Sequence, residues 1–257
     1  MTPSHLETLP ASQKPMAASH AGPTASAWQP LYLVAGATAL SIVGIMVIQI
    51  IVYIAWPPPS TVLGYFTLFH QNGLLGLLSL DLLYMVDTAL VVPLYLALYA
   101  ALRRTSPSLM AIALALGLVG IAAYFASNTA FEMLSLSSQY AVATTAAQRS
   151  LFQAAGQAML AVYQGSAFNV YYILNALATL IISVVMLRSM LFGKVAASAG
   201  IAAGALMLIP STAGTIGLYF AFGSLVPTLI WLILIARRLF RLAQGGSKEE
   251  AKQLAMP

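Results

Sequence analysis

Two acidic residues, Asp81 and Asp87, lie inside a membrane-length apolar stretch at residues 73–104. Ionisable side chains inside a membrane are costly and often mark a binding site or an ion path. On a helix, Tyr84 and Thr88 share the face of Asp81, and Asp87 lies three residues from Tyr84. These spacings predict a group of polar side chains that can bind a ligand.

Other polar residues fall at a similar depth in the membrane. Asp87 precedes Arg103 by sixteen residues (103 − 87), about 24 Å along a helix that must cross a core about 30 Å thick. Asp81 is then near the outer boundary, and the inner half holds mainly hydroxyl groups. An outward-facing pocket above an apolar floor explains this asymmetry better than a pore does. The candidate ligand-binding residues are Asp81, Tyr84, Asp87, Asn128, Asn169 and Asn175.

A structural role is the alternative for each of these residues. Buried Asp, Asn and Tyr side chains often only join helices, and one such hydrogen bond contributes about 0.6 kcal/mol. Asp81 can equally be an interfacial residue, and Glu132 a solvated charge outside the membrane.

The residues needed for most enzymatic chemistry are missing from the sequence. It has no cysteine, which excludes thiolate nucleophiles, iron–sulfur clusters and Cys-bound zinc. It has only three histidines and none lies within a predicted span, which excludes a haem held by two intramembrane histidines. The HExxH, GxSxG and Walker A patterns do not occur. Asp81 and Asp87 point about 120° apart on a helix, which argues against an aspartyl dyad. We expect no catalytic residues, no metal and no cofactor, and enzymatic activity is not favoured.

The composition predicts an all-α polytopic membrane protein. Hydrophobic residues make up 60% of the 257 positions and charged residues 7%, compared with about 25% charged in soluble domains. The apolar runs are long and continuous, which is typical of membrane helices and not of a barrel. The formal charge of +5 comes from bases at the ends of apolar runs. The expected partner is the lipid bilayer, and nucleic acid is excluded.

Six transmembrane helices are predicted between a disordered cytoplasmic tail at 1–29 and a second cytoplasmic tail at 243–257. The bases after the second, fourth and sixth helices place both termini in the cytoplasm by the positive-inside rule. Prolines at 93 and 227 should bend two helices, and Gly200 with Gly204 should permit close packing. The expected helices cover about 31–56, 73–104, 108–131, 166–188, 195–210 and 215–242.

An external amphipathic helix is predicted at about 145–164. Thr145 is in position to cap it, with Gln148 three residues later as in a capping box. Its apolar stripe should pack on the membrane surface or cover the end of the bundle.

Three stretches resemble a bacterial family of multi-pass membrane proteins, the domain of unknown function numbered four-three-eight-six. They are DLLYMVDTALVVPLYLALYAALRR, VMLRSMLFGK and WLILIARRLFRL, and the likeness extends over about residues 31–242. The resemblance implies a bacterial inner membrane and a six-helix core, and it carries no catalytic residue onto this chain.

Three functional hypotheses follow. The first is a protein that binds a small amphipathic ligand, a lipid or a partner membrane protein, with Asp87, Tyr84 and Asn175 as anchors. The second is a secondary transporter whose bent helices move against each other. The third is an intramembrane enzyme acting on lipid, with Glu132 or Asp81 as its only acid–base candidates.

Overall fold

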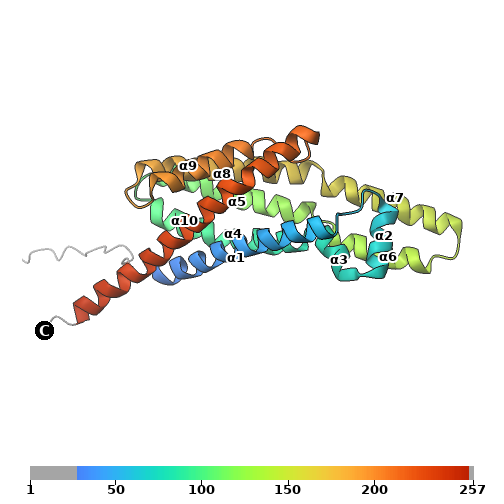
Figure 1. Ribbon diagram of the computed structural model, residues 1–257, viewed down its shortest axis with the longest axis horizontal. Coiled ribbons are helices and arrows are strands. Elements are labelled where there is room, and N and C mark those ends of the chain that lie inside the picture. The colour runs from blue at the N-terminus through green and yellow to red at the C-terminus, as the bar shows by residue number, and fades with distance from the viewer. Residues whose placement is uncertain (1–27, 255–257) are drawn as a thin grey trace, which may run out of the picture.

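The structure is a computed structural model that describes the backbone of residues 28–254 and the side chains up to residue 245. Residues 1–27 of the predicted N-terminal tail lie outside the described range. All regular structure in residues 28–254 is helical, and it is drawn in Figure 1. The helices are α1 Gln29–Ala55, α2 Val62–Gln71, α3 Gly73–Ser79, α4 Leu82–Leu102, α5 Pro107–Ser127, α6 Ala130–Val142, α7 Ala146–Tyr163, α8 Ser166–Arg188, α9 Lys194–Leu206 and α10 Gly214–Leu254.

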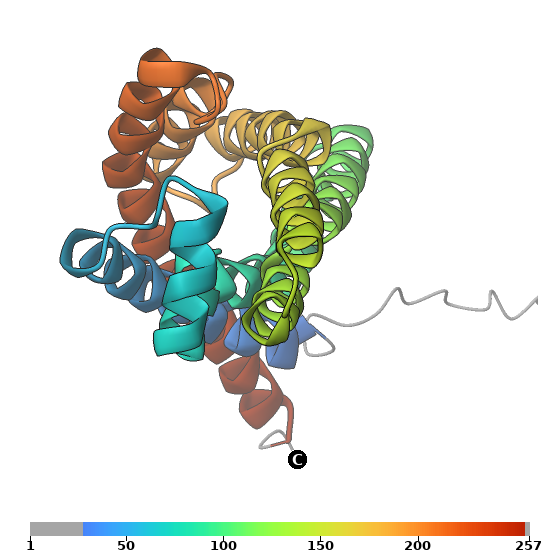
Figure 2. The same ribbon diagram turned by 90° about the vertical axis from the view of Figure 1, so that its right-hand side faces the viewer.

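Six of these helices form a closed ring. Neighbours pack in the order α1, α4, α5, α8, α9, α10, and α10 packs back against α1. Figure 2 is viewed along the long axis of the molecule, through the ring, and shows α1 and α10 beside each other. Gly200 and Gly204 permit the close approach of α9 to α8, because a Cβ atom at Gly204 would lie 3.0 Å from the Ala176 carbonyl oxygen. A ring arrangement leaves room at its centre.

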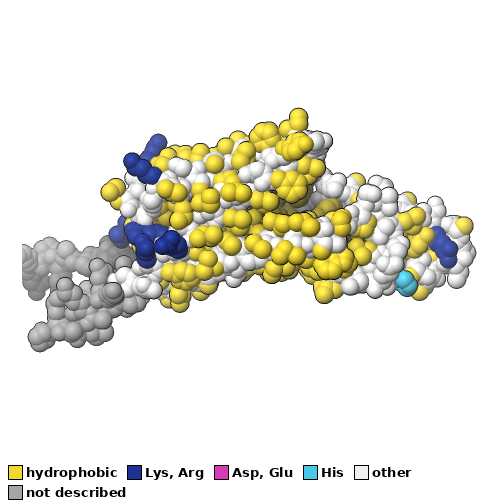
Figure 3. All heavy atoms as spheres, in the orientation of Figure 1, with side chains coloured by type: hydrophobic (Ala, Val, Ile, Leu, Met, Phe, Trp, Pro, Cys, Tyr) yellow, Lys and Arg dark blue, Asp and Glu magenta, His cyan; other side chains and the backbone are white. Residues whose placement is uncertain are grey.

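The ring has the composition of a membrane bundle. Five helical segments within residues 28–254 are long and apolar enough to cross a membrane, and α9, with 13 residues, is a shorter apolar helix. Large side chains such as Ile51, Val119 and Leu187 are exposed on its outside, where lipid would cover them. The visible face of the bundle is largely hydrophobic (Figure 3). The prediction of an all-α polytopic membrane protein is confirmed.

Basic residues gather at one end of the long axis. Figure 3 shows Lys and Arg side chains gathered at the end where α4 and α8 finish and α9 begins, with further basic atoms at the opposite end. This distribution agrees with the alternation of bases on which the orientation was predicted. We call the basic end the inner end and the opposite end the outer end.

Beyond the outer end, the chain builds a second layer that we call the outer cap: α2, α3, α6 and α7. Phe66, Phe69 and Met133 are buried among these helices in a hydrophobic cluster separate from that of the ring. Only two residues separate α5 from α6, which follows it. Likewise only two residues separate α7 from α8. Two ring helices therefore extend into the outer cap (Figure 1).

The structure divides two of the predicted helices. The expected helix at 73–104 consists of α3 and α4, because Asp81 between them has a left-handed conformation with φ 64°. The expected helix at 108–131 ends at Ser127, where Asn128 is extended and its side chain accepts a hydrogen bond from the Ala130 amide at 3.1 Å. Asn128 also donates to the Leu80 carbonyl at 2.9 Å, so one side chain holds both breaks together.

The remaining elements differ from expectation mainly at their ends. The capping box of Thr145 and Gln148 is present at the start of α7. This helix extends along the long axis within the outer cap (Figure 1). The helix predicted at 195–210 ends at Leu206, and residues 243–254 of the expected C-terminal tail continue α10.

Candidate functional site

A cavity of 330 Å³ lies inside the outer half of the ring. Helices α1, α4, α8, α9 and α10 all contribute to its walls, and most of the lining is apolar. Towards the inner end it is closed by side chains that are fully buried in the ring core, among them Leu98, Ile182 and Ile235. The cavity therefore reaches from the outer end to about the middle of the ring and no further.

Asp87 is the buried acid of this cavity. It belongs to α4, lines the cavity, and is only 5% exposed. Its Oδ1 atom has no hydrogen-bond partner among the described residues, and the lining contains no Lys, Arg or His. A buried carboxylate without a partner is unfavourable, so this group must hold a proton or pair with a cation or hydrogen-bond donor that enters the cavity.

Hydrogen bonds between α4 and α8 form one wall. The Tyr84 and Tyr171 hydroxyl groups are 2.7 Å apart, and the Tyr95 hydroxyl donates to Asn175 Oδ1 at 2.8 Å. Asn175 Nδ2 in turn donates to the Tyr171 carbonyl at 3.2 Å. Gly117 of α5 lies directly against the Tyr95 ring, where a larger residue would overlap it. The absence of a side chain at Gly117 thus allows the Tyr95 ring to occupy the position from which its hydroxyl reaches Asn175.

Aromatic rings surround the outer part of the cavity. Phe168 and Tyr172 of α8 line it, with their ring centroids 5.8 Å apart. Tyr171 packs against Tyr124 of α5 with centroids at 4.9 Å. Trp231 of α10 also lines the cavity, and its Nε1 atom has no partner among the described residues. Aromatic faces attract cations within about 6 Å, and here they share a cavity with a carboxyl group.

Asp81 lies at the outer end of the cavity and joins three parts of the molecule. The Tyr53 hydroxyl of α1 donates to Asp81 Oδ1, and the Tyr163 hydroxyl of α7 donates to Oδ2. Burial raises the pKa of Asp81, and the two tyrosine hydrogen bonds act in the opposite direction. This three-residue cluster, which we call the tyrosine clasp, attaches the outer cap to the ring beside the cavity.

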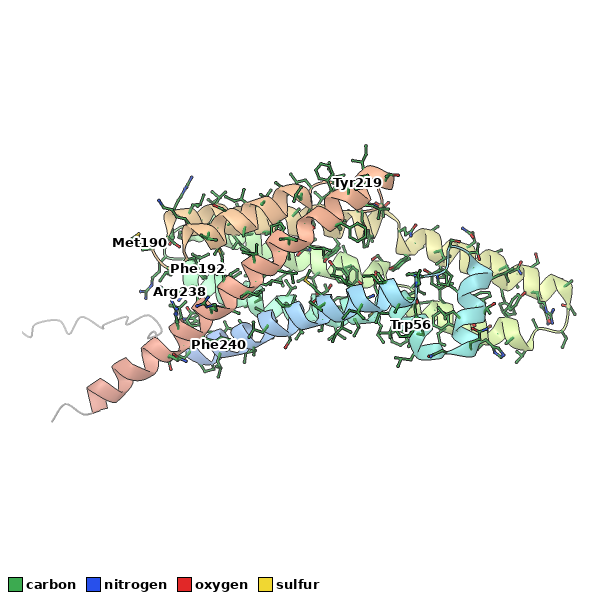
Figure 4. The ribbon with its side chains drawn as sticks, viewed as in Figure 1. Trp56, Met190, Phe192, Tyr219, Arg238 and Phe240 are labelled. Atoms are coloured by element: carbon green, nitrogen blue, oxygen red, sulfur yellow. The ribbon has the colours of Figure 1, made fainter. Side chains whose placement is uncertain are left out.

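The cavity opens sideways between α1 and α10. The two helices are in contact towards the inner end, where a Cβ atom at Gly36 would lie 3.0 Å from the Phe240 ring. They separate towards the outer end, so that Trp56 and Tyr219 lie well apart (Figure 4). The surface between them is hollowed in Figure 3, and Phe222 at this edge is 66% exposed. The opening therefore lies on the side of the ring, beside exposed apolar side chains, and not at its basic inner end.

Four of the six candidate residues line this one cavity, and two do not. The lining includes Asp81, Tyr84, Asp87 and Asn175. Asn128 instead joins the helix breaks described above. Asn169 donates to the Gly165 carbonyl at 2.9 Å and accepts from the Thr212 hydroxyl at 2.5 Å, which connects α8 to the turn before α10.

Glu132, a candidate in the enzyme hypothesis, is exposed on α6 and is not part of the cavity lining. Asp81, the other candidate, is already hydrogen-bonded on both carboxyl oxygens. In the described part of the chain no group of three or more His, Cys, Asp or Glu side chains is placed to hold a metal.

Sequence reasoning did not select the aromatic half of the site. Tyr53, Tyr163, Tyr171 and Tyr172 carry no distinguishing signal of their own, because tyrosines near the ends of membrane helices mostly belong to interfacial belts. One signal was available, because Tyr171 and Tyr172 precede Asn175 by four and three residues and so share its helix face.

Comparison with known proteins gives a family without an assigned activity. No curated protein and no solved structure matches the chain. Residues 31–240 match the family described as a domain of unknown function, DUF4386, and this range includes most of all six ring helices. The chain therefore belongs to the DUF4386 family of membrane proteins.

Proposed function

We propose that this protein binds a small amphipathic molecule with a cationic head in the cavity of its ring. The observation that carries the proposal is Asp87, a carboxyl group 5% exposed, without a hydrogen-bond partner at Oδ1, inside a largely apolar cavity. A ligand ammonium group supplies the missing charge, and its apolar part replaces water along the remaining walls.

The dimensions and the walls support this ligand class. A volume of 330 Å³ lies at the small end of the range of about 300–1,000 Å³ found for ligand pockets. The head lies at Asp87, within reach of the Tyr84 hydroxyl, and the Phe168 and Tyr172 rings provide aromatic faces for a cation. The apolar part points to the opening between α1 and α10. An anionic ligand is disfavoured, since nothing in the lining would neutralise it.

The route of entry follows from the lateral opening. A ligand already dissolved in the outer leaflet reaches the cavity without crossing the headgroup layer of the outer end. We place the protein in the bacterial inner membrane with six spans and both termini in the cytoplasm, as the gathering of bases at one end supports. The ligand is then taken from the periplasmic leaflet.

The test uses three small ligands that share a 4-phenylbutyl body and differ only in the head: 4-phenylbutylamine, 4-phenylbutanol and 5-phenylvalerate. Thermal unfolding of the purified protein in dodecyl maltoside is followed as each is added. We expect stabilisation by the amine alone, and its loss in Asp87→Asn. Glu132→Gln is the matched control, because it removes an exposed carboxylate outside the cavity and should bind the amine normally.

Two outcomes would count against the proposal. Equal stabilisation by the amine and the alcohol would show that charge is not recognised. An unchanged amine affinity in Asp87→Asn would place the binding site elsewhere. Accessibility gives a second readout, because the chain has no native cysteine. A single cysteine at position 175 or 222, with Asp87 retained, should react with a membrane-permeant thiol reagent, and the amine should protect position 175.

A transporter is the second candidate, favoured by the two proline-containing helices. Pro93 of α4 and Pro227 of α10 interrupt the hydrogen-bond ladders of two helices that line the cavity. Transport would require these helices to separate at the buried inner floor. Uptake of labelled phenylbutylamine into proteoliposomes under a proton gradient of either direction tests it, and binding without Asp87-dependent flux leaves binding as the function.

A further inference from the structure

A second hollow lies at the inner end, on the opposite half of the molecule from the cavity. It has a volume of 400 Å³ and lies between α10 and the connection from α8 to α9. Three arginines of α10, Arg237, Arg238 and Arg241, line it together. Figure 4 shows Arg238 close to Phe192 and Met190 of that connection. The hollow is therefore basic on one side and apolar on the other.

These three arginines have no protein counter-charge in the described side chains. None of them forms an ion pair or a hydrogen bond there, and the Nε atom of Arg238 is buried without a partner. The positive-inside rule accounts for bases at this end, but it does not require them to share one hollow. Arg104 and Arg188 meet the same rule without lining it. The three guanidinium groups are thus in place to bind an anion.

An apolar groove continues from this hollow along the outside of the ring. It runs between α9 and α10, shares Val195 with the basic hollow, and includes Ala199, Val226 and Ile230. Small side chains on α9 and the bend at Pro227 of α10 leave the groove open. From Arg237 to Val226 is eleven residues (237 − 226), about 16 Å, which is about half of the hydrocarbon core.

We propose that this surface binds one anionic phospholipid of the inner leaflet. Its phosphate pairs with Arg237, Arg238 and Arg241, since guanidinium groups match phosphate oxygens well. One acyl chain follows the groove between α9 and α10 towards the middle of the membrane. The basic hollow lies at the inner end and the apolar groove leads from it towards the middle of the membrane. A phospholipid of the inner leaflet places its head and its chains in the same positions. The site is separate from the cavity and does not depend on the proposed ligand there.

The experiment measures lipid binding by native mass spectrometry of the full-length protein in dodecyl maltoside. Dioleoyl phosphatidylglycerol and dioleoyl phosphatidylcholine carry the same chains and differ in net charge. We expect phosphatidylglycerol to bind at least about tenfold more tightly, and Arg237→Gln/Arg241→Gln to remove most of this preference. Both arginines are exposed, so the variant should fold. The matched control is Arg104→Gln/Arg188→Gln, which removes two exposed bases at the same end and should keep the preference.

The groove and the source of the phosphate are tested separately. Ser198→Phe fills the groove without touching the arginines, and it should weaken phosphatidylglycerol binding several-fold. Glycerol 3-phosphate, which has the phosphate without the chains, should not compete at millimolar concentration. Three results would overturn the proposal: equal binding of the two lipids, an equal loss in the control variant, or full competition by glycerol 3-phosphate, which would indicate a simple anion site.

Discussion

Removing one hydroxyl group from the tyrosine clasp should measurably loosen the attachment of the outer cap. Tyr163 of α7 and Tyr53 of α1 each donate one hydrogen bond to a different carboxyl oxygen of Asp81. Tyr163→Phe removes one donor without changing the ring that packs in the outer cap. The substitution therefore isolates the hydrogen bond from the packing.

The expected magnitude lies between two reference values. A hydrogen bond to a charged group contributes about 1.5–3 kcal/mol in soluble proteins, whereas one between membrane helices averages about 0.6 kcal/mol. Asp81 is only partly buried, because it lines the cavity at the outer end, so water can replace part of the lost bond. We expect a loss of about 1 kcal/mol in the free energy of unfolding. In a chain of this size that corresponds to about 3 °C in Tm.

The assay is thermal unfolding in dodecyl maltoside, repeated in an Asp81→Gly background. Glycine tolerates the left-handed conformation at this position, so the background removes the acceptor without backbone strain. Tyr163→Phe should then have almost no effect, and Tyr53→Phe should behave in the same way. An equal loss of Tm with and without the Asp81 carboxyl group would refute the clasp, because the cost would then come from packing.

The same scan as a function of pH tests the charge state of Asp81. Burial raises its pKa in the folded protein, so the folded state holds this proton more tightly than the unfolded chain does. Its contribution to stability should be fully present below the ordinary pKa of 3.8 and be lost as pH rises through the raised value. If stability instead increases with pH across this window, and Asp81→Asn abolishes the increase, the pKa of Asp81 is lowered and not raised by folding.

Three further predictions use the same unfolding measurement. Asp87→Leu should stabilise the ligand-free protein by about 1–3 kcal/mol, since it removes an unpaired buried carboxyl group, and a lower Tm would mean that Asp87 has a partner inside the protein. Gly117→Leu should lower Tm or prevent folding because the new side chain overlaps the Tyr95 ring. Gly44→Leu should be tolerated, because a Cβ atom there would have no neighbour within 4 Å apart from the nearby backbone of its own helix. Thr145→Ala should cost about 1 kcal/mol by removing the α7 cap, and Thr145→Ser should restore it.

Depth and composition could be predicted from the sequence because they depend on one chain segment at a time. The position of Asp87 in the outer half of a membrane helix follows from its distance to Arg103, and the α7 capping box follows from Thr145 and Gln148 alone. Each of these features is set by local geometry, so no knowledge of the neighbouring helices was needed.

The features that depend on helix neighbours could not be predicted in this way. Asn128 looks like a pocket residue by depth, but it holds two helix breaks together through the Leu80 carbonyl and the Ala130 amide. The break at Asp81 is invisible in a continuous apolar pattern, because a single left-handed residue changes no hydrophobic periodicity. Tyr53 and Tyr163 are 110 residues apart (163 − 53), and only the fold brings them to one carboxyl group.

The pairing of α1 with α10 has a consequence for biogenesis. Because α10 follows the other ring helices in the chain, the contact of Gly36 with Phe240 cannot form until α10 has been synthesised and inserted. Until then the inward side of α1 and its Gln49 side chain have no α10 opposite them. A nascent chain that stops before residue 214 would therefore present an open, incomplete ring to the membrane.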